Sequence, residues 1–264
     1  MQRTSIGEIE LAFVDRGSGL PVVLLHGFPL DHTMWNAQID ALAANCRVIA
    51  PDLRGFGQSD VTGGTVTMEQ LADDLAALLA AIGIDEPVVM CGLSMGGYVA
   101  FAFQRQYAGR LRGLILCDTR AENDTTEVAA ARTEMAARVL REGLAPLVEG
   151  MMPRLLAESS AENHAELSES LRRVMLGSDR RGVAAAALGM ARRANVTETL
   201  GEIDCPALVI VGAHDAISPR EEMAAISRAI PHSRFVEISG SGHMSPMEAP
   251  AEVNAAILEF LATL

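Results

Sequence analysis

Ser94 has the surroundings that a nucleophilic serine needs. It lies in the segment VVMCGLSMGGYVAF, residues 88–101, between Gly92 and Gly96, with an apolar β-prone stretch before it and a helix-like stretch after it. A serine hydroxyl is a poor nucleophile until a base takes its proton, and substrate and base both reach it when it stands on a sharp strand-to-helix turn. Such a turn crowds the residues two before and two after the serine, so glycine at both positions indicates this turn.

A histidine and two aspartates are candidates for the other parts of a proton relay. His243 ends the stretch GSGH, whose two glycines permit a loop that brings the imidazole to Ser94 as general base and then general acid. Asp215 and Asp118 each follow a strand-like run, and either carboxylate could orient the imidazole and stabilise its protonated form. Together these residue types would perform nucleophilic acyl transfer.

Strand-like runs precede each of these candidates. The runs are short and wholly apolar, or alternate in polarity, as the strands of a covered sheet do. They predict strands at Glu10–Val14, Pro21–Leu25, Arg47–Ala50, Val88–Cys91, Leu114–Cys117, Ala207–Val211 and Arg234–Ile238. The alternating run Glu10–Val14 is expected at an edge of the sheet.

Helix signals alternate with the strands. Thr67 begins a T-x-x-Q capping box that ends at Gln70, ahead of a periodic apolar face. Pro250 suits the first turn of a last helix. Further helices are expected at Thr33–Ala43, from the glycines after the candidate serine to about Tyr107, and near Arg220–Ala229.

This alternation predicts an α/β fold with a mostly parallel central sheet flanked by helices. From residue 120 to residue 198 the alternation stops, and the chain reads as helix, loop and helix. We therefore expect a core domain of residues 1–119 and 199–264, and a helical insertion of residues 120–198 that forms a lid (cap) over one edge. Ligands of such sheets bind beyond the carboxyl ends of the strands, where the candidate residues lie.

Composition narrows the class of partner. The 264 residues carry a formal charge of −13, which argues against nucleic acid and anionic membrane surfaces as partners. No apolar run approaches the ~18 residues of a membrane span. The first ten residues, MQRTSIGEIE, have no signal-peptide core. All 21 basic residues are arginines, which excludes catalysis by a lysine.

The cysteines and histidines indicate neither a disulfide nor a metal. No cysteine belongs to a C-x-x-C pair, and all four lie in or beside strand-like runs, as small buried residues in a reducing compartment do. The four are Cys46, Cys91, Cys117 and Cys205. The expected location is therefore the cytoplasm. His26, Asp31 and His32 lack the spacing and the supporting ligands of a metal site, so we expect no metal and no cofactor.

Five motifs in this order resemble those of the α/β-hydrolase family over nearly the whole chain. They are HGFP at 26–29, DLRGFGQSD at 52–60, GLSMGG at 92–97, GAHD at 212–215 and GSGHMSPME at 240–248. Within the family the chain looks most like small bacterial carboxylesterases and 3-oxoadipate enol-lactonases. Cofactor-free haloperoxidases, which also act as perhydrolases, share much of the pattern.

The resemblance implies specific roles for several residues. It places the acid at Asp215, in the G-x-H-D motif, although some family members carry the acid at the position of Asp118. It places an oxyanion hole at the backbone N–H groups of Phe28 and Met95. It also implies a cis peptide bond before Pro29.

Four residues are candidates for contact with substrate. Trp35 follows the second predicted strand and could reach the pocket from there. Met152, in the insertion, and Met244, beside the candidate histidine, carry flexible thioethers that suit an adaptable apolar pocket. An enol-lactone substrate, which the resemblance implies, carries a carboxylate that Arg120, or one of the arginine pairs at 172–173 and 192–193, could bind.

The sequence therefore predicts a serine hydrolase that cleaves small-molecule carboxylic esters or lactones through an acyl-enzyme. Enol-lactonase activity, and perhydrolysis of the haloperoxidase kind, are the alternatives within the family. A ligand receptor that keeps the same residues without turnover is the alternative from another class. The sequence leaves the oligomeric state open.

Overall fold

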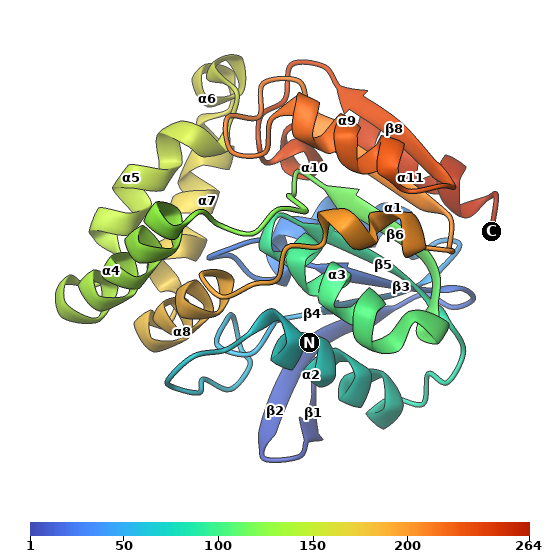
Figure 1. The fold of residues 1–264 in the computed structure, drawn as a ribbon, viewed down its shortest axis with the longest axis horizontal. Coiled ribbons are helices and arrows are strands. Elements are labelled where there is room, and N and C mark those ends of the chain that lie inside the picture. Colours follow the sequence, from blue (N-terminus) through green and yellow to red (C-terminus); the bar gives the residue numbers. More distant parts are fainter.

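The computed structural model describes residues 1–264, with the side chain of Asn163 excepted. Within these residues an eight-stranded sheet runs in the order β1-β2-β4-β3-β5-β6-β7-β8 through the centre of the molecule (Figure 1). The strands are β1 (Gln2–Ile6), β2 (Ile9–Arg16), β3 (Pro21–Leu25), β4 (Arg47–Pro51), β5 (Val88–Leu93), β6 (Leu111–Cys117), β7 (Ala207–Gly212) and β8 (Ser233–Ile238). The strand before Ser94 therefore lies in the interior of the sheet.

The strands from β3 to β8 pair in parallel, as the apolar runs predict. β3, β5 and β7 are buried along their whole length because helices cover both of their faces. Parallel strands bring their carboxyl ends to one edge of a sheet. The loops that follow β3, β5, β6, β7 and β8 therefore meet at this edge.

The amino-terminal strands differ from the prediction. The run Glu10–Val14 is expected at an edge, but β2 is an inner strand, paired antiparallel with β1 on one side and with β4 on the other. Gly7, with a φ of 73°, permits the tight turn that joins β1 to β2. β1 is polar and largely exposed, so its sequence carries no strand signal and the prediction of the edge was wrong.

Helices cover both faces of the sheet. They are α1 (Asn36–Leu42), preceded by the short η1 (His32–Trp35), and α2 (Met68–Ala81), α3 (Met95–Tyr107), α9 (Arg220–Ala229), α10 (Ser245–Glu248) and α11 (Pro250–Leu261), with the short η2 (Ala108–Arg110) and η3 (Thr197–Glu202). α2 packs on α3 and α1 packs on α11, and Figure 1 shows these pairs on opposite faces. Thr67 caps α2, since its Oγ1 accepts the N–H of Gln70 at 3.1 Å. Among the described helices none has the length and apolar character to cross a membrane.

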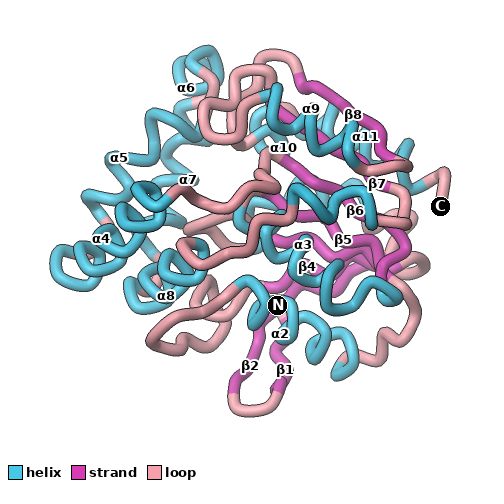
Figure 2. Tube along the Cα trace, in the orientation of Figure 1, coloured by secondary structure: helices cyan, strands magenta, loops and turns pink.

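Between β6 and β7 the chain forms the helical insertion. Its helices are α4 (Thr126–Glu142), α5 (Ala145–Leu155), α6 (Glu158–Asn163), α7 (Ala165–Gly177) and α8 (Arg180–Met190), and Figure 2 shows them gathered at one side of the sheet. α8 carries glycine where it meets the core. A Cβ on Gly182 would collide with the backbone of Gly55, and a Cβ on Gly189 would collide with the backbone of Val66. These close backbone contacts fix the insertion on the core.

Candidate active site

Ser94 stands on a strained turn between β5 and α3. Its φ of 53° and ψ of −112° lie in a region that residues other than glycine rarely adopt. Backbone contacts hold it there: its N–H donates to the carbonyl of Cys117 at 3.0 Å, and its carbonyl accepts the hydroxyl of Thr119 at 2.7 Å. The residue itself is only half-buried. The turn therefore presents the hydroxyl at the carboxyl edge of the sheet.

Close backbone contacts explain the glycines around Ser94. A Cβ on Gly92 would collide with the backbone of Gly96, and a Cβ on Gly96 would collide with the carbonyl group of Leu25. The crowding predicted at positions 92 and 96 is thus confirmed. A Cβ on Gly97 would collide with the side chain of Thr119, so α3 approaches the loop after β6 closely.

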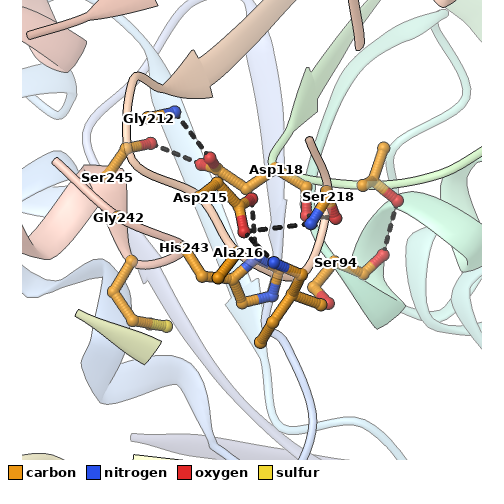
Figure 3. Close-up of polar contacts among 12 residues, drawn as sticks. Ser94, Asp118, Gly212, Asp215, Ala216, Ser218, Gly242, His243 and Ser245 are labelled. Atoms are coloured by element: carbon orange, nitrogen blue, oxygen red, sulfur yellow. Dashed lines mark hydrogen bonds and ion pairs between the residues drawn. The ribbon is translucent and has the colours of Figure 1, made fainter. Parts of the chain in front are cut away.

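His243 and Asp215 form a buried pair at the same edge. The Nδ1 atom of His243 lies 2.8 Å from Oδ2 of Asp215, and Figure 3 shows both in one close-up with Ser94. The other oxygen of Asp215 accepts the N–H groups of Ile217 at 2.7 Å and of Ser218 at 2.9 Å. Burial opposes ionisation of Asp215, but His243 and these N–H donors outweigh it and hold the pKa of Asp215 below its usual range.

This arrangement fixes the tautomer of His243. An ionised carboxylate only accepts hydrogen bonds, so Nδ1 carries the proton that is donated to Asp215. In the neutral form of the ring, Nε2 is then the nitrogen without a proton and can take one from a hydroxyl. Across the described contacts no hydrogen bond joins Nε2 to the Ser94 hydroxyl, and such catalytic contacts tighten in the complex with substrate.

Asp118 is held away from the imidazole by other partners. It is fully buried, with a φ of 47°, and its carboxyl group accepts the N–H of Gly212 at 2.8 Å and the hydroxyl of Ser245 at 2.5 Å (Figure 3). Burial, followed by the charge of Asp215, raises the pKa of Asp118 well above its usual range. Of the two aspartates, Asp215 is the one that meets His243.

The two backbone N–H groups predicted to form an oxyanion hole are unpaired among the described residues. In the described chain neither the N–H of Phe28 nor that of Met95 has a hydrogen-bond partner. Met95 opens α3, so its N–H is one of the donors that a helix N-terminus leaves free. The peptide bond between Phe28 and Pro29 is cis, as the resemblance implies.

His26 braces the loop that carries Phe28. It is fully buried, its Nε2 accepts the N–H of Leu53 at 3.0 Å, and its Nδ1 lies 3.0 Å from the carbonyl of Gly27. Burial lowers the pKa of His26, against the opposing effect of Gly27. A neutral imidazole that accepts at Nε2 and donates at Nδ1 matches both contacts.

A second histidine–aspartate pair lies beneath this loop. Nδ1 of His32 lies 2.7 Å from Asp52, which is fully buried and also accepts the N–H groups of His32 at 2.9 Å and Gln58 at 2.8 Å. Asp31 lies close enough to make a three-residue cluster with them. One carboxylate oxygen of Asp31 accepts the N–H and the hydroxyl of Thr33. Asp52 accepts three donors, so hydrogen bonds within the protein account for the cluster without a metal ion.

The residues predicted to contact substrate differ in their exposure and partners. Trp35 has no exposed surface, so a ligand reaches it only if the core around it moves. Met244 is 1% exposed. The guanidinium of Arg120 is bound to both oxygens of Glu222, at 2.7 and 2.8 Å. Met152 is half-buried in the insertion. Contact of these four residues with substrate stays a prediction.

The helical insertion reaches the candidate site through Phe28. The half-buried Phe28 side chain packs against the small cluster formed by Ala136 of α4 and by Ala184 and Ala187 of α8. Next to it, the carbonyl of Pro29 accepts the hydroxyl of Ser178 at 3.2 Å, from the link between α7 and α8. The insertion thus borders the loop that supplies one of the unpaired N–H groups.

Known proteins resemble the chain over almost its full length. The family model described as alpha/beta hydrolase fold matches residues 21–250. The 3-oxoadipate enol-lactonase 1 of Acinetobacter baylyi is 30% identical over 229 residues, which cover 87% of this chain and 84% of that protein.

Two solved structures superpose closely on the whole molecule. A thermophilic esterase from Thermogutta terrifontis, with malate bound, is 54% identical with a TM-score of 0.99, covering 100% of this chain and 99% of that chain. An enol-lactonase from Burkholderia xenovorans LB400 is 28% identical with a TM-score of 0.92, covering 99% of this chain and 100% of that chain. With its sheet order, its strained serine turn and this similarity, the chain belongs to the alpha/beta hydrolase fold family.

Proposed function

We propose that this protein is a carboxylic ester hydrolase in which Ser94, His243 and Asp215 form the catalytic triad. One observation carries the proposal: the strained turn presents the Ser94 hydroxyl at the edge where His243 is paired with a carboxylate. In its neutral form, His243 offers Nε2 as a base at this edge, and a serine hydroxyl is an effective nucleophile only when such a base takes its proton.

The reaction proceeds in two steps. Nε2 of His243 takes the proton of the Ser94 hydroxyl as the oxygen attacks the ester carbonyl, and the proton is then given to the departing alcohol. Water, deprotonated by the same nitrogen, next attacks the acyl-enzyme, and the proton returns to the Ser94 oxygen as the carboxylic acid leaves. Asp215 holds the ring in the required tautomer and stabilises the imidazolium in both steps.

The free N–H groups of Phe28 and Met95 would stabilise the tetrahedral intermediates. In each step a negative charge develops on the former carbonyl oxygen, and preorganised donors are most effective on a charge that appears only then. The N-terminus of α3 adds its positive end at the same place.

A simple ester is the favoured substrate class, and a lactone is the second. The 54% identity to the Thermogutta esterase supports an ester, and the similarity to the enol-lactonases supports a lactone. One observation favours the ester over the enol-lactone: Arg120, one of the arginines that could bind the lactone's carboxylate, is bound to Glu222.

A substrate panel tests the proposal. Hydrolysis of p-nitrophenyl esters of increasing acyl length is compared with hydrolysis of an enol-lactone, for the wild type and for Ser94→Ala. We expect steady turnover of the esters by the wild type, and a kcat lower by about 10³-fold or more in the variant. Full activity of Ser94→Ala contradicts the triad, a single release of product without turnover indicates a receptor, and a strong preference for the lactone replaces the esterase assignment.

A further inference from the structure

The carboxylate of Glu248 holds the loop that carries His243. Glu248 ends α10, five residues after the histidine. Its Oε1 accepts the N–H of Gly242 at 2.9 Å and the N–H of Met244 at 3.1 Å. These donors belong to the residues immediately before and after His243, so one oxygen fixes the backbone on both sides of the imidazole.

The second oxygen of Glu248 reaches the helical insertion. Oε2 accepts the N–H of Ala157 at 2.9 Å, in the link between α5 and α6. The end of α5 makes a backbone contact with the same loop, since the N–H of Met244 also donates to the carbonyl of Leu155 at 3.1 Å. A Cβ placed on Gly242 would lie 2.5 Å from the nitrogen of Ala157, so the two backbones touch directly.

These contacts make the position of His243 depend on one side chain. Hydrogen bonds to an ionised carboxylate are stronger than those between neutral groups. Gly242 is buried, so water does not readily replace the acceptor that its N–H would lose, whereas the N–H of Met244 keeps the carbonyl of Leu155. A displacement of about 1 Å in a catalytic group lowers a rate by up to about 10²-fold.

We propose that Glu248 is a positioning residue, which sets the orientation of His243 by binding the N–H groups on either side of it and anchoring them to the helical insertion. The inference rests on the proposed function in that His243 is taken as the base. Glu248 itself meets the backbone of the loop and not the imidazole, so it acts through His243.

Two variants and a matched control test this role. Glu248→Ala removes all three acceptor contacts. Glu248→Gln keeps one oxygen for Gly242 and Met244 but turns an NH₂ group toward the N–H of Ala157. Glu252→Gln is the control, because Glu252 is an exposed carboxylate in the first turn of α11, a few residues away.

The readouts are kcat and KM for a p-nitrophenyl ester, the melting temperature, and the proton NMR signal of the His243 Nδ1–H that is donated to Asp215. We expect Glu248→Ala to lower kcat by about 10- to 100-fold with KM within about 3-fold, and to shift or broaden the imidazole signal. Glu248→Gln should lose about 3- to 10-fold in kcat with a smaller spectral change, and the control should match the wild type.

The result that overturns the inference is a folded Glu248→Ala or Glu248→Gln with the kcat and the imidazole signal of the control, or with a change in KM alone. If Glu248→Ala does not fold, Glu248→Gln decides by the same criteria. The NMR signal needs no turnover. Failure of the proposed function, seen as full activity in Ser94→Ala, is therefore distinguishable from failure of the positioning role.

Discussion

The imidazole Nδ1 of His243 lies 2.8 Å from the carboxylate of Asp215, although the two residues are 28 positions apart in the chain. Asp215 follows β7 and His243 follows β8, and these strands are parallel neighbours. Their carboxyl ends therefore deliver the two side chains to the same place. A Cβ on Gly212 would collide with the backbone of Gly242, so the loops themselves are in contact behind the pair.

The two buried aspartates should respond differently to loss of charge. Asp215→Asn removes the carboxylate that orients His243, and we expect kcat to fall by about 10²- to 10⁴-fold. Asp118→Asn keeps an oxygen for the N–H of Gly212 and offers an NH₂ donor to Ser245, so we expect kcat within about 10-fold of the wild type. Steady-state kinetics on one ester measures both.

Melting temperatures accompany these measurements and show that each variant is folded. A loss of kcat in Asp118→Asn, with Asp215→Asn close to the wild type, would place the catalytic acid after β6 instead of after β7. Wild-type activity in both variants would show that neither carboxylate takes part in the mechanism.

The turn at Ser94 should not accept a methyl group at Gly92. The new Cβ would meet the backbone of Gly96, which has no flexible side chain to move aside. We expect Gly92→Ala to lower the free energy of unfolding by at least about 2 kcal/mol, which corresponds to a melting temperature lower by roughly 4–8 °C.

Gly150→Ala is the matched control for this substitution. Gly150 lies exposed in α5, and a Cβ there has no neighbour within 4 Å. Alanine should stabilise this helix by about 0.5–1 kcal/mol. Similar melting temperatures for the two variants would show that the serine turn is not crowded.

The pair of His32 and Asp52 should make stability depend on pH. Burial opposes protonation of His32, but the hydrogen bond and charge of Asp52 outweigh it and raise the pKa of His32 above 6.5. The folded state therefore binds the proton more tightly than the unfolded state. The contribution of protonated His32 to the stability of the folded state is complete below about pH 6.5 and is lost as the pH rises through the raised pKa.

His32→Asn isolates this contribution, because asparagine keeps an N–H donor for Asp52 but does not titrate. Urea unfolding from about pH 5.5 to about pH 8.5 should show the wild type most favoured over the variant at the acid end. A difference between the two proteins that is constant with pH, or that grows toward alkaline pH, would contradict the account.

The catalytic candidates could be predicted from sequence because their signals are local. Glycine at positions 92 and 96 indicates steric crowding within a few residues of Ser94. The run Val88–Cys91 predicts the strand that precedes Ser94. Parallel strands then bring the loop after each of them to one edge without any further information. The sequence therefore predicts that His243 and Asp215 lie at the same edge of the sheet, as the structure shows.

The parts that sequence reasoning missed depend on contacts between distant segments. β1 is polar, and its place at the sheet edge follows from its pairing with β2. The sequence does not predict the ion pair between Arg120 and Glu222, because the two residues are 102 positions apart. Glu248 stands within the GSGHMSPME motif, but its role depends on an N–H at Ala157, 91 positions away.

Covalent labelling with a fluorophosphonate probe tests the central claim most directly, because the probe modifies an activated serine and the adduct does not turn over. Peptide mapping by mass spectrometry should find a single adduct, on the peptide that contains Ser94, with labelling strongly slowed in His243→Ala. Continued ester hydrolysis by protein that is unmodified at Ser94 after treatment, or an adduct formed on another residue as activity is lost, would contradict the account.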